Sequence, residues 1–221
     1  VNPYLSHALL IAAVEDGLLT INDAPVQLRG ASIHEDEPGH GPALSDQDVR
    51  QIVAHLKAIG ANVTRAHYAL DPRLLDAFDA AGILVWAQAP VYHRDDELAT
   101  TAGRDEALRA LRAAVVQTRN HPSVITHSVA NELSVTPDTR PGTRDYLNAA
   151  LDATRALDPT LPVSVDLEEH ALDRAGADVD ADRICHVVLL DCDAAQARAS
   201  AVLPSSTTAR HANVAPPSAP V

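Results

Sequence analysis

Short apolar runs alternate with amphipathic segments over residues 20 to 166 of this 221-residue chain, and this alternation constrains the fold more than any other feature. The expected strands are residues 26–31, 61–66, 83–87, 124–129 and 163–166. The expected helices are residues 45–59, 71–82, 106–119 and 143–157. Strands and helices that alternate through short loops predict a parallel sheet with right-handed crossovers.

Two architectures fit this pattern, an open doubly wound sheet and a (β/α)8 barrel. A nucleotide-binding sheet carries a glycine-rich loop after its first strand, and this chain has only Gly30 there. Polar residues follow three of the expected strands instead, namely His34, Glu35 and Asp36, then His67 and Tyr68, then Asn131 and Glu132. Barrel enzymes place their chemistry at this C-terminal rim. We therefore expect an α/β fold, a TIM barrel truncated to about five or six βα units.

The chain divides into three expected parts. Residues 1–17 are interpreted as the remnant of a preceding β domain or a linker, and residues 18–192 as the partial barrel. Within the latter, residues 184–190 resemble one further strand. Residues 193–221 are dominated by Ala, Ser, Thr and Pro, a composition typical of a disordered tail.

Charge and composition exclude several classes of partner. Seventeen basic and thirty acidic residues give a net charge of −13, which disfavours nucleic acid and anionic membranes. The longest apolar run, residues 8–14, is far shorter than the about 20 residues needed to span a bilayer. Cys185 and Cys192 lack the spacing of a zinc site and are too few for a disulfide framework. We expect a soluble, cytoplasmic protein without a cofactor; a homo-oligomer is compatible with the sequence.

The segment 120–132 is the most informative in the chain. A buried strand runs directly into the pair Asn131 and Glu132. A glycosidase needs a carboxylic acid to protonate the leaving oxygen and an amide to bind the neighbouring hydroxyl, and this pair supplies both groups. A solvated loop glutamate beside a turn asparagine has the same spacing, so the spacing alone leaves both interpretations open.

Three segments together resemble glycoside hydrolase family 2, which contains β-galactosidases, β-glucuronidases and β-mannosidases. Residues 120–132, from Asn-His-Pro-Ser to Asn-Glu, are similar to the family's signature. Residues 22–36 resemble its barrel-opening strand with the following His-Glu-Asp, and residues 60–72 resemble its Asn-x-x-Arg and His-Tyr motif. The three occur in the family's order, and the resemblance covers about residues 18 to 166.

The resemblance implies a role for five matched residues. Glu132 would be the general acid/base of a retaining β-glycosidase, and Asn131 would bind the sugar near its 2-hydroxyl. His34 and His67 would line the site, and Arg65 would support the end of the second strand. The implied substrate is a β-galactoside or a β-glucuronide. Where the family commonly has tryptophan before the Asn-Glu pair, this chain has a histidine, His127.

The expected nucleophile is missing. A retaining glycosidase needs a second carboxylate about 5 Å from the first, and in this family it is a glutamate on the seventh strand. The last glutamate of this chain is Glu169 and its last carboxylate is Asp193. We therefore expect a fragment that is inactive alone.

Two alternatives remain open. The first is a non-catalytic, carbohydrate-binding barrel remnant that keeps Asn131, His34 and His67. The second is a metal-dependent barrel hydrolase built on His34, Asp36 and His40. Such sites favour a His-x-His pair on the first strand, which the chain lacks, so no metal is expected.

Overall fold

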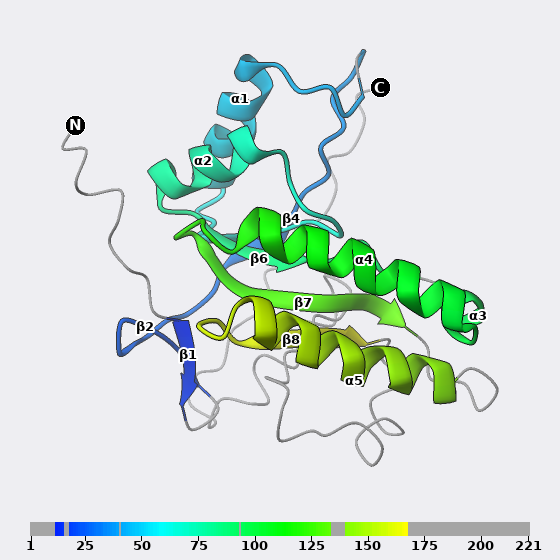
Figure 1. The fold of residues 1–221 in the computed structure, drawn as a ribbon. Coiled ribbons are helices and arrows are strands. Elements are labelled where there is room, and N and C mark those ends of the chain that lie inside the picture. The colour runs from blue at the N-terminus through cyan, green and yellow to red at the C-terminus, as the bar shows by residue number, and fades with distance from the viewer. Residues whose placement is uncertain (1–11, 16–17, 40, 93, 134–139, 168–221) are drawn as a thin grey trace, which may run out of the picture.

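The computed structural model describes residues 12–15, 18–39, 41–92, 94–133 and 140–167 (Figure 1). The expectations for residues 184–190, for both cysteines and for the tail 193–221 lie outside these residues. None of the described helices combines the length and the apolar character needed to cross a bilayer.

Five parallel strands form the central sheet. They are β4 (Gly30–Ser32), β5 (Val63–Arg65), β6 (Leu84–Gln88), β7 (Val124–Leu133) and β8 (Val163–Leu167). Their order in the sheet is their order in the chain, and every neighbouring pair is parallel. A doubly wound sheet reverses its strand order at a switch point, whereas a barrel does not. The strand order is therefore that of consecutive barrel units, as predicted.

Helices connect the strands and cover one face of the sheet (Figure 1). They are α1 (Asp46–Ala58), α2 (Pro72–Ala81), α3 (Asp95–Leu98), α4 (Thr101–Thr118) and α5 (Arg140–Leu157). Ser45 and Asp48 form a capping box at the start of α1, because the Ser45 hydroxyl accepts from the Asp48 amide at 3.3 Å and the Asp48 carboxylate accepts from the Ser45 amide at 2.7 Å. Gly82 ends α2 with a φ of 68°, the left-handed conformation that favours glycine.

Helix α4 begins five residues earlier than the sequence indicates. Thr100 caps it, since its hydroxyl accepts from the Gly103 amide at 3.1 Å. Gly103 has low helix propensity, which masked the first turn in the sequence. The glycine is required there, because a Cβ at this position would lie 2.0 Å from the carbonyl oxygen of Glu97. Packing of α3 against α4 thus overrides local propensity.

An antiparallel sheet precedes β4, and the sequence did not predict it. Strands β1 (Ala12–Glu15), β2 (Leu18–Ile21) and β3 (Ala24–Pro25) pair in order. Asn22 and Asp23 have φ angles of 51° and 64°, so they form a two-residue connection between β2 and β3 of the type that matches strand twist. The strand expected over 26–31 is wrong for most of its length, because only residues 30–32 pair in the sheet. The hairpin spans the expected boundary at residue 17, and the domain limits stay a prediction.

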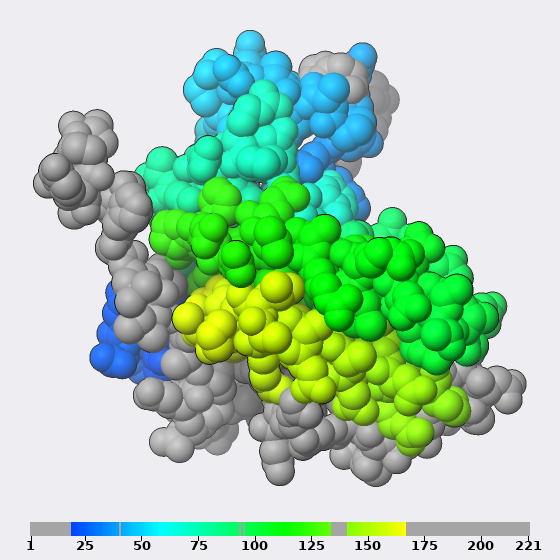
Figure 2. All heavy atoms as spheres, viewed as in Figure 1, coloured from blue at the N-terminus to red at the C-terminus, as the bar shows by residue number. Residues whose placement is uncertain are grey.

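Buried side chains pack on both faces of the parallel sheet. Helices α1 and α2 pack against β6, and helices α4 and α5 pack on β7 and β8. In Figure 2, α4 and α5 form one continuous surface. On the other face, Trp86 and Ile125 pack with Leu19 and Ile21 of β2. The hairpin thus lies at the end of the sheet where the strands begin, which leaves the opposite end for the polar residues (Figure 1).

Candidate active site

The carboxyl ends of the parallel strands bring together polar side chains that are far apart in the sequence. Arg65 ends β5, Gln88 ends β6, and Asn131 lies near the end of β7. Asp166 is the penultimate residue of β8 and pairs in register with Asn131. The backbone amide of Asn131 also donates to the Val91 carbonyl at 2.9 Å, which ties the end of β7 to the segment after β6.

The Arg65 guanidinium is the centre of this group. Its Nη2 contacts the Asp166 carboxylate at 3.0 Å, donates to Gln88 Oε1 at 3.1 Å and donates to Asn131 Oδ1. Its Nη1 lies 3.3 Å from His67 Nε2. The Arg65 side chain is 12% exposed, so this charge needs a counter-ion within the protein, and Asp166 supplies it.

Asp166 is a buried carboxylate with three hydrogen-bonding neighbours. Its Oδ2 accepts from Gln88 Nε2 at 2.7 Å and from Ser128 Oγ at 3.2 Å, in addition to the Arg65 contact. Burial raises the pKa of the Asp166 carboxyl to about 6, although the Arg65 charge and the three hydrogen bonds oppose the rise. Burial therefore makes the Asp166 carboxyl easier to protonate than an exposed aspartate.

His34 and His67 lie at the same edge. Their ring centroids are 5.4 Å apart, and the ring of Tyr68 lies 6.2 Å from that of His34. The Glu35 amide donates to the Tyr68 hydroxyl at 2.7 Å, and the Glu35 carboxylate accepts from the Asp71 amide at 2.6 Å. Burial raises the pKa of Glu35 above its ordinary value. These contacts fix the segment after β4 against the segment after β5.

Glu132 follows Asn131 with an uncommon backbone conformation. Its φ is 48°, in the left-handed region that non-glycine residues seldom adopt, and the pairing of β7 with β8 is irregular on both sides of Asn131. Such strain costs about 1–3 kcal/mol and occurs preferentially at functional sites. The side chain of Glu132 is half-buried. Neighbouring strands therefore hold the backbone of the expected acid/base residue in a specific conformation.

The five predicted site residues share one edge of the sheet, and four of them are linked by contacts. Arg65 contacts Asn131 and His67, and the tilted rings of His34 and His67 lie 5.4 Å apart. Their chemical roles stay predictions. Gln88 and Asp166 were missed, although each is a polar residue at the end of a buried strand, the same signal that singled out Asn131.

His127, the residue in the position of the family's tryptophan, is buried below the site. Its Nε2 lies 2.9 Å from Asp158 Oδ2, and Asp158 Oδ1 accepts from the Thr160 backbone at 2.9 Å. The His127 hydrogen bond holds the pKa of the Asp158 carboxyl well below its usual range. This buried pair joins β7 to the loop after α5 and does not belong to the polar group around Arg65.

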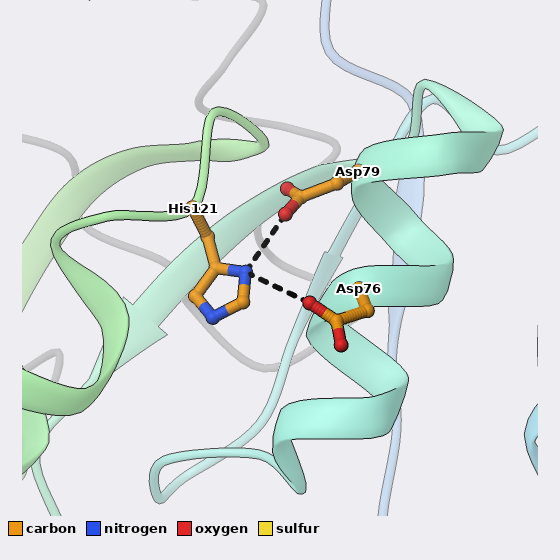
Figure 3. Close-up of side chains that lie close together, drawn as sticks. All are labelled: Asp76, Asp79 and His121. Atoms are coloured by element: carbon orange, nitrogen blue, oxygen red, sulfur yellow. Dashed lines mark hydrogen bonds and ion pairs between the residues drawn. The ribbon is translucent and has the colours of Figure 1, made fainter. Parts of the chain in front are cut away.

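A second polar cluster lies at the opposite ends of the strands. Asp76 and Asp79 of α2 point toward His121, in the loop before β7 (Figure 3). His121 Nδ1 lies 2.7 Å from Asp79 Oδ2 and 3.9 Å from Asp76 Oδ1, and Asp79 Oδ1 accepts from the Ser123 amide at 2.9 Å. These hydrogen bonds join helix α2 to the loop before β7.

The same three residues are relevant to the alternative of a metal-dependent hydrolase. Among the described residues, Asp76, Asp79 and His121 are the one group with metal-ligand spacing. The alternative set of His34, Asp36 and His40 includes His40, which lies outside the part of the chain that the structure describes.

Comparison with known proteins places the chain among glycosidases. Residues 12–197 match the model of the family "Glycosyl hydrolases family 2, TIM barrel domain". A protein of Formosa agariphila named "Putative beta-glucuronidase" is 32% identical over 157 residues, which are 68% of this chain and 19% of that protein. The chain therefore spans about a fifth of the length of this curated relative.

Solved structures give the same result. The β-glucuronidase of Parabacteroides merdae aligns with a TM-score of 0.66 and 27% identity over 73% of this chain and 21% of its own. The β-D-glucuronidase of Dictyoglomus thermophilum aligns with a TM-score of 0.65 and 30% identity, covering 72% of this chain and 29% of its own.

A third similar structure is that of an enzyme named for a different sugar acid. The β-galacturonidase of Eisenbergiella tayi, bound to galacturonate, aligns with a TM-score of 0.66 and 25% identity over 72% of this chain and 28% of its own. The family match covers well over half of the chain, in agreement with the strand order and the resemblance of the three motifs. The chain therefore belongs to glycosyl hydrolase family 2, and its described parallel strands and helices form part of that family's TIM-barrel domain.

Proposed function

We propose that this chain contributes the general acid/base half of the active site of a retaining β-glycosidase that acts on β-glucuronides. The observation that carries the proposal is the end of β7, where Asn131 accepts from Arg65 and Glu132 adopts the left-handed conformation at the same edge as His34 and His67. The preference for a glucuronide over a galactoside rests on the relatives, which are named β-glucuronidases.

The proposed chemistry assigns two steps to Glu132. Its carboxylic acid donates a proton to the glycosidic oxygen while a second carboxylate attacks the anomeric carbon, so the bond to the leaving group breaks and a glycosyl-enzyme ester forms. The resulting Glu132 carboxylate then accepts a proton from the water that hydrolyses this ester. Asn131 binds the hydroxyl beside the reacting carbon.

The second carboxylate is proposed to be absent from this chain. Asp166 pairs in register with Asn131, but its side chain is 1% exposed and its Oδ2 contacts Arg65, Gln88 and Ser128, so we propose that it does not attack the sugar. We therefore expect the chain alone to bind a sugar without turning it over.

Hydrolysis and binding of nitrophenyl β-glycosides test the proposal. The purified chain is compared with Glu132→Gln, with Glu106→Gln as a matched control because Glu106 is exposed on α4. We expect binding of the β-D-glucuronide in preference to the β-D-galactoside, with no turnover by any variant. Turnover that disappears only in Glu132→Gln would support the acid/base role and contradict the missing nucleophile. Equal turnover by both variants would refute the role of Glu132, and a preference for the galactoside would refute the substrate.

A further inference from the structure

Asn131 is held by a network whose charged members lie on other strands. Arg65 donates to Asn131 Oδ1, and Asp166 is the counter-ion of Arg65 at 3.0 Å. Because Oδ1 is engaged by the guanidinium, a sugar hydroxyl would meet the Nδ2 amide group of Asn131 and accept a hydrogen bond from it. The orientation of this amide therefore depends on where Arg65 lies.

The side-chain amide of Gln88 has a defined orientation between Arg65 and Asp166. Its Oε1 accepts from Arg65 at 3.1 Å, while its Nε2 donates to Asp166 at 2.7 Å and to the Ala130 carbonyl at 2.8 Å. An ionised carboxylate only accepts hydrogen bonds, so an ionised Asp166 fixes which end of the Gln88 amide faces Arg65. The guanidinium is thus held from two sides, by a charge and by an oriented amide.

Burying the Asp166 carboxylate is costly for the fold. The residue is 1% exposed, and its Oδ1 has no hydrogen-bond partner among the described residues. Its raised pKa means that burial outweighs the attraction of Arg65. An apolar pair in this place would often be as stable or more so. A costly charge one contact away from Asn131 is expected where function needs the orientation it imposes.

We propose that Asp166 is a positioning residue of the active site: it holds the Arg65 guanidinium, and through it the Asn131 side chain, in the orientation that receives the sugar hydroxyl. Its effect on a sugar rests on the proposed function, whereas its effect on Arg65 and Asn131 does not. Asp166 acts through Arg65, so its removal should disturb these two side chains before any ligand is added.

NMR spectroscopy of the full 221-residue chain tests the positioning without a sugar. The side-chain amide of Asn131 and the Nε–H of Arg65 are followed in the wild type, in Asp166→Asn and in Asp158→Asn. The last is a matched control, since Asp158 is also buried but pairs with His127 away from the site. We expect the Asn131 amide protons to exchange about tenfold faster in Asp166→Asn only. Equal exchange in all three proteins would overturn the proposal.

A pH titration separates positioning from general damage to the fold. In the wild type, the Asn131 amide signal should follow the ¹³C carboxyl signal of Asp166, and Asp166→Asn should lack this transition. Among the described residues, Arg65 is the charged group in contact with Asp166. Two further titratable groups adjoin the network, namely His67, which contacts Arg65, and Glu132, which follows Asn131 in the chain. A transition of the Asn131 signal that persists in Asp166→Asn and vanishes in His67→Gln would overturn the proposal.

Binding of p-nitrophenyl β-D-glucuronide then tests the consequence for the site. At equal folded fraction, we expect Asp166→Asn to weaken binding about tenfold, the lower end of the loss found when residues that orient metal ligands are removed. Asp158→Asn should leave binding unchanged. Wild-type affinity in Asp166→Asn would overturn the proposal. If the wild type does not bind the probe, the proposed function of the chain fails, and the NMR comparison still decides the role of Asp166.

Discussion

The substitution Asp166→Asn should change how the free energy of unfolding depends on pH, in addition to its effect on the site. Asparagine keeps the shape of the side chain and removes its titration. Burial raises the pKa of the Asp166 carboxyl to about 6 in the folded chain, from the ordinary aspartate value of 3.8. The variant also leaves Arg65 without its counter-ion, but the guanidinium stays protonated at every pH of interest, so that contribution does not change with pH.

The sign follows from proton linkage. Between about pH 4 and about pH 6 the folded chain binds a proton at Asp166 that the unfolded chain has released, so the free energy of unfolding falls as the pH rises. The stabilisation from proton binding at Asp166 is fully present below the pKa of this carboxyl in the unfolded chain, and it is lost as the pH rises through about 6. At 1.36 kcal/mol for each pKa unit, the loss totals about 3 kcal/mol, of which about 2 kcal/mol falls between pH 4 and pH 7.

Urea denaturation followed by circular dichroism, repeated from about pH 4 to about pH 8, measures this loss. The free energy of unfolding of the wild type minus that of Asp166→Asn should decrease by about 2 kcal/mol between pH 4 and pH 7. Asp105→Asn is the control, because Asp105 is an exposed aspartate on α4 and its difference curve should be flat. A flat or rising curve for Asp166→Asn would refute the reasoning that burial outweighs the Arg65 charge.

Three further substitutions test the packing, each by urea denaturation. Asp158→Ala leaves His127 buried without its partner and should lower the free energy of unfolding by about 3–5 kcal/mol. Because pairing lowers the Asp158 pKa, this stabilisation is present above about pH 4 and is lost in acid. An unchanged cost at low pH would contradict the pairing. Phe78→Ala empties a fully buried position and should cost about 3–5 kcal/mol; a cost below about 1 kcal/mol would contradict the core. Gly30→Ala puts a Cβ 2.2 Å from the Val63 carbonyl oxygen and should cost at least about 1–3 kcal/mol, whereas a neutral effect would contradict the close approach of β4 to β5.

Much of the fold follows from local pattern. The strands ending at Gln88 and Leu167 and the helix capped by Ser45 were predicted within a few residues, because hydrophobic period, capping residues and helix-ending glycines are read from neighbouring residues. The hairpin around Asn22 and Asp23 was missed, since its strands are short and the turn alone does not say which segments pair.

The candidate site was predicted in part for the same reason. Asn131 and Glu132 adjoin each other in the sequence, so their chemistry could be read together. The left-handed backbone conformation of Glu132 could not be predicted from the sequence, because it results from the irregular pairing of β7 with β8. Helix α4 likewise begins where α3 packs against Gly103, a contact that residue preferences do not contain.

The sequence alone determined that this chain alternates strands and helices and that an Asn-Glu pair ends a buried strand at the expected rim. Only the tertiary structure decided that Arg65 lies between Asn131 and Asp166, with Gln88 oriented across them. Periodicity specifies which face of a strand is buried. The partner of a polar side chain at a strand end depends on the register between neighbouring strands, and that register is set by the packing of the crossover helices against the sheet.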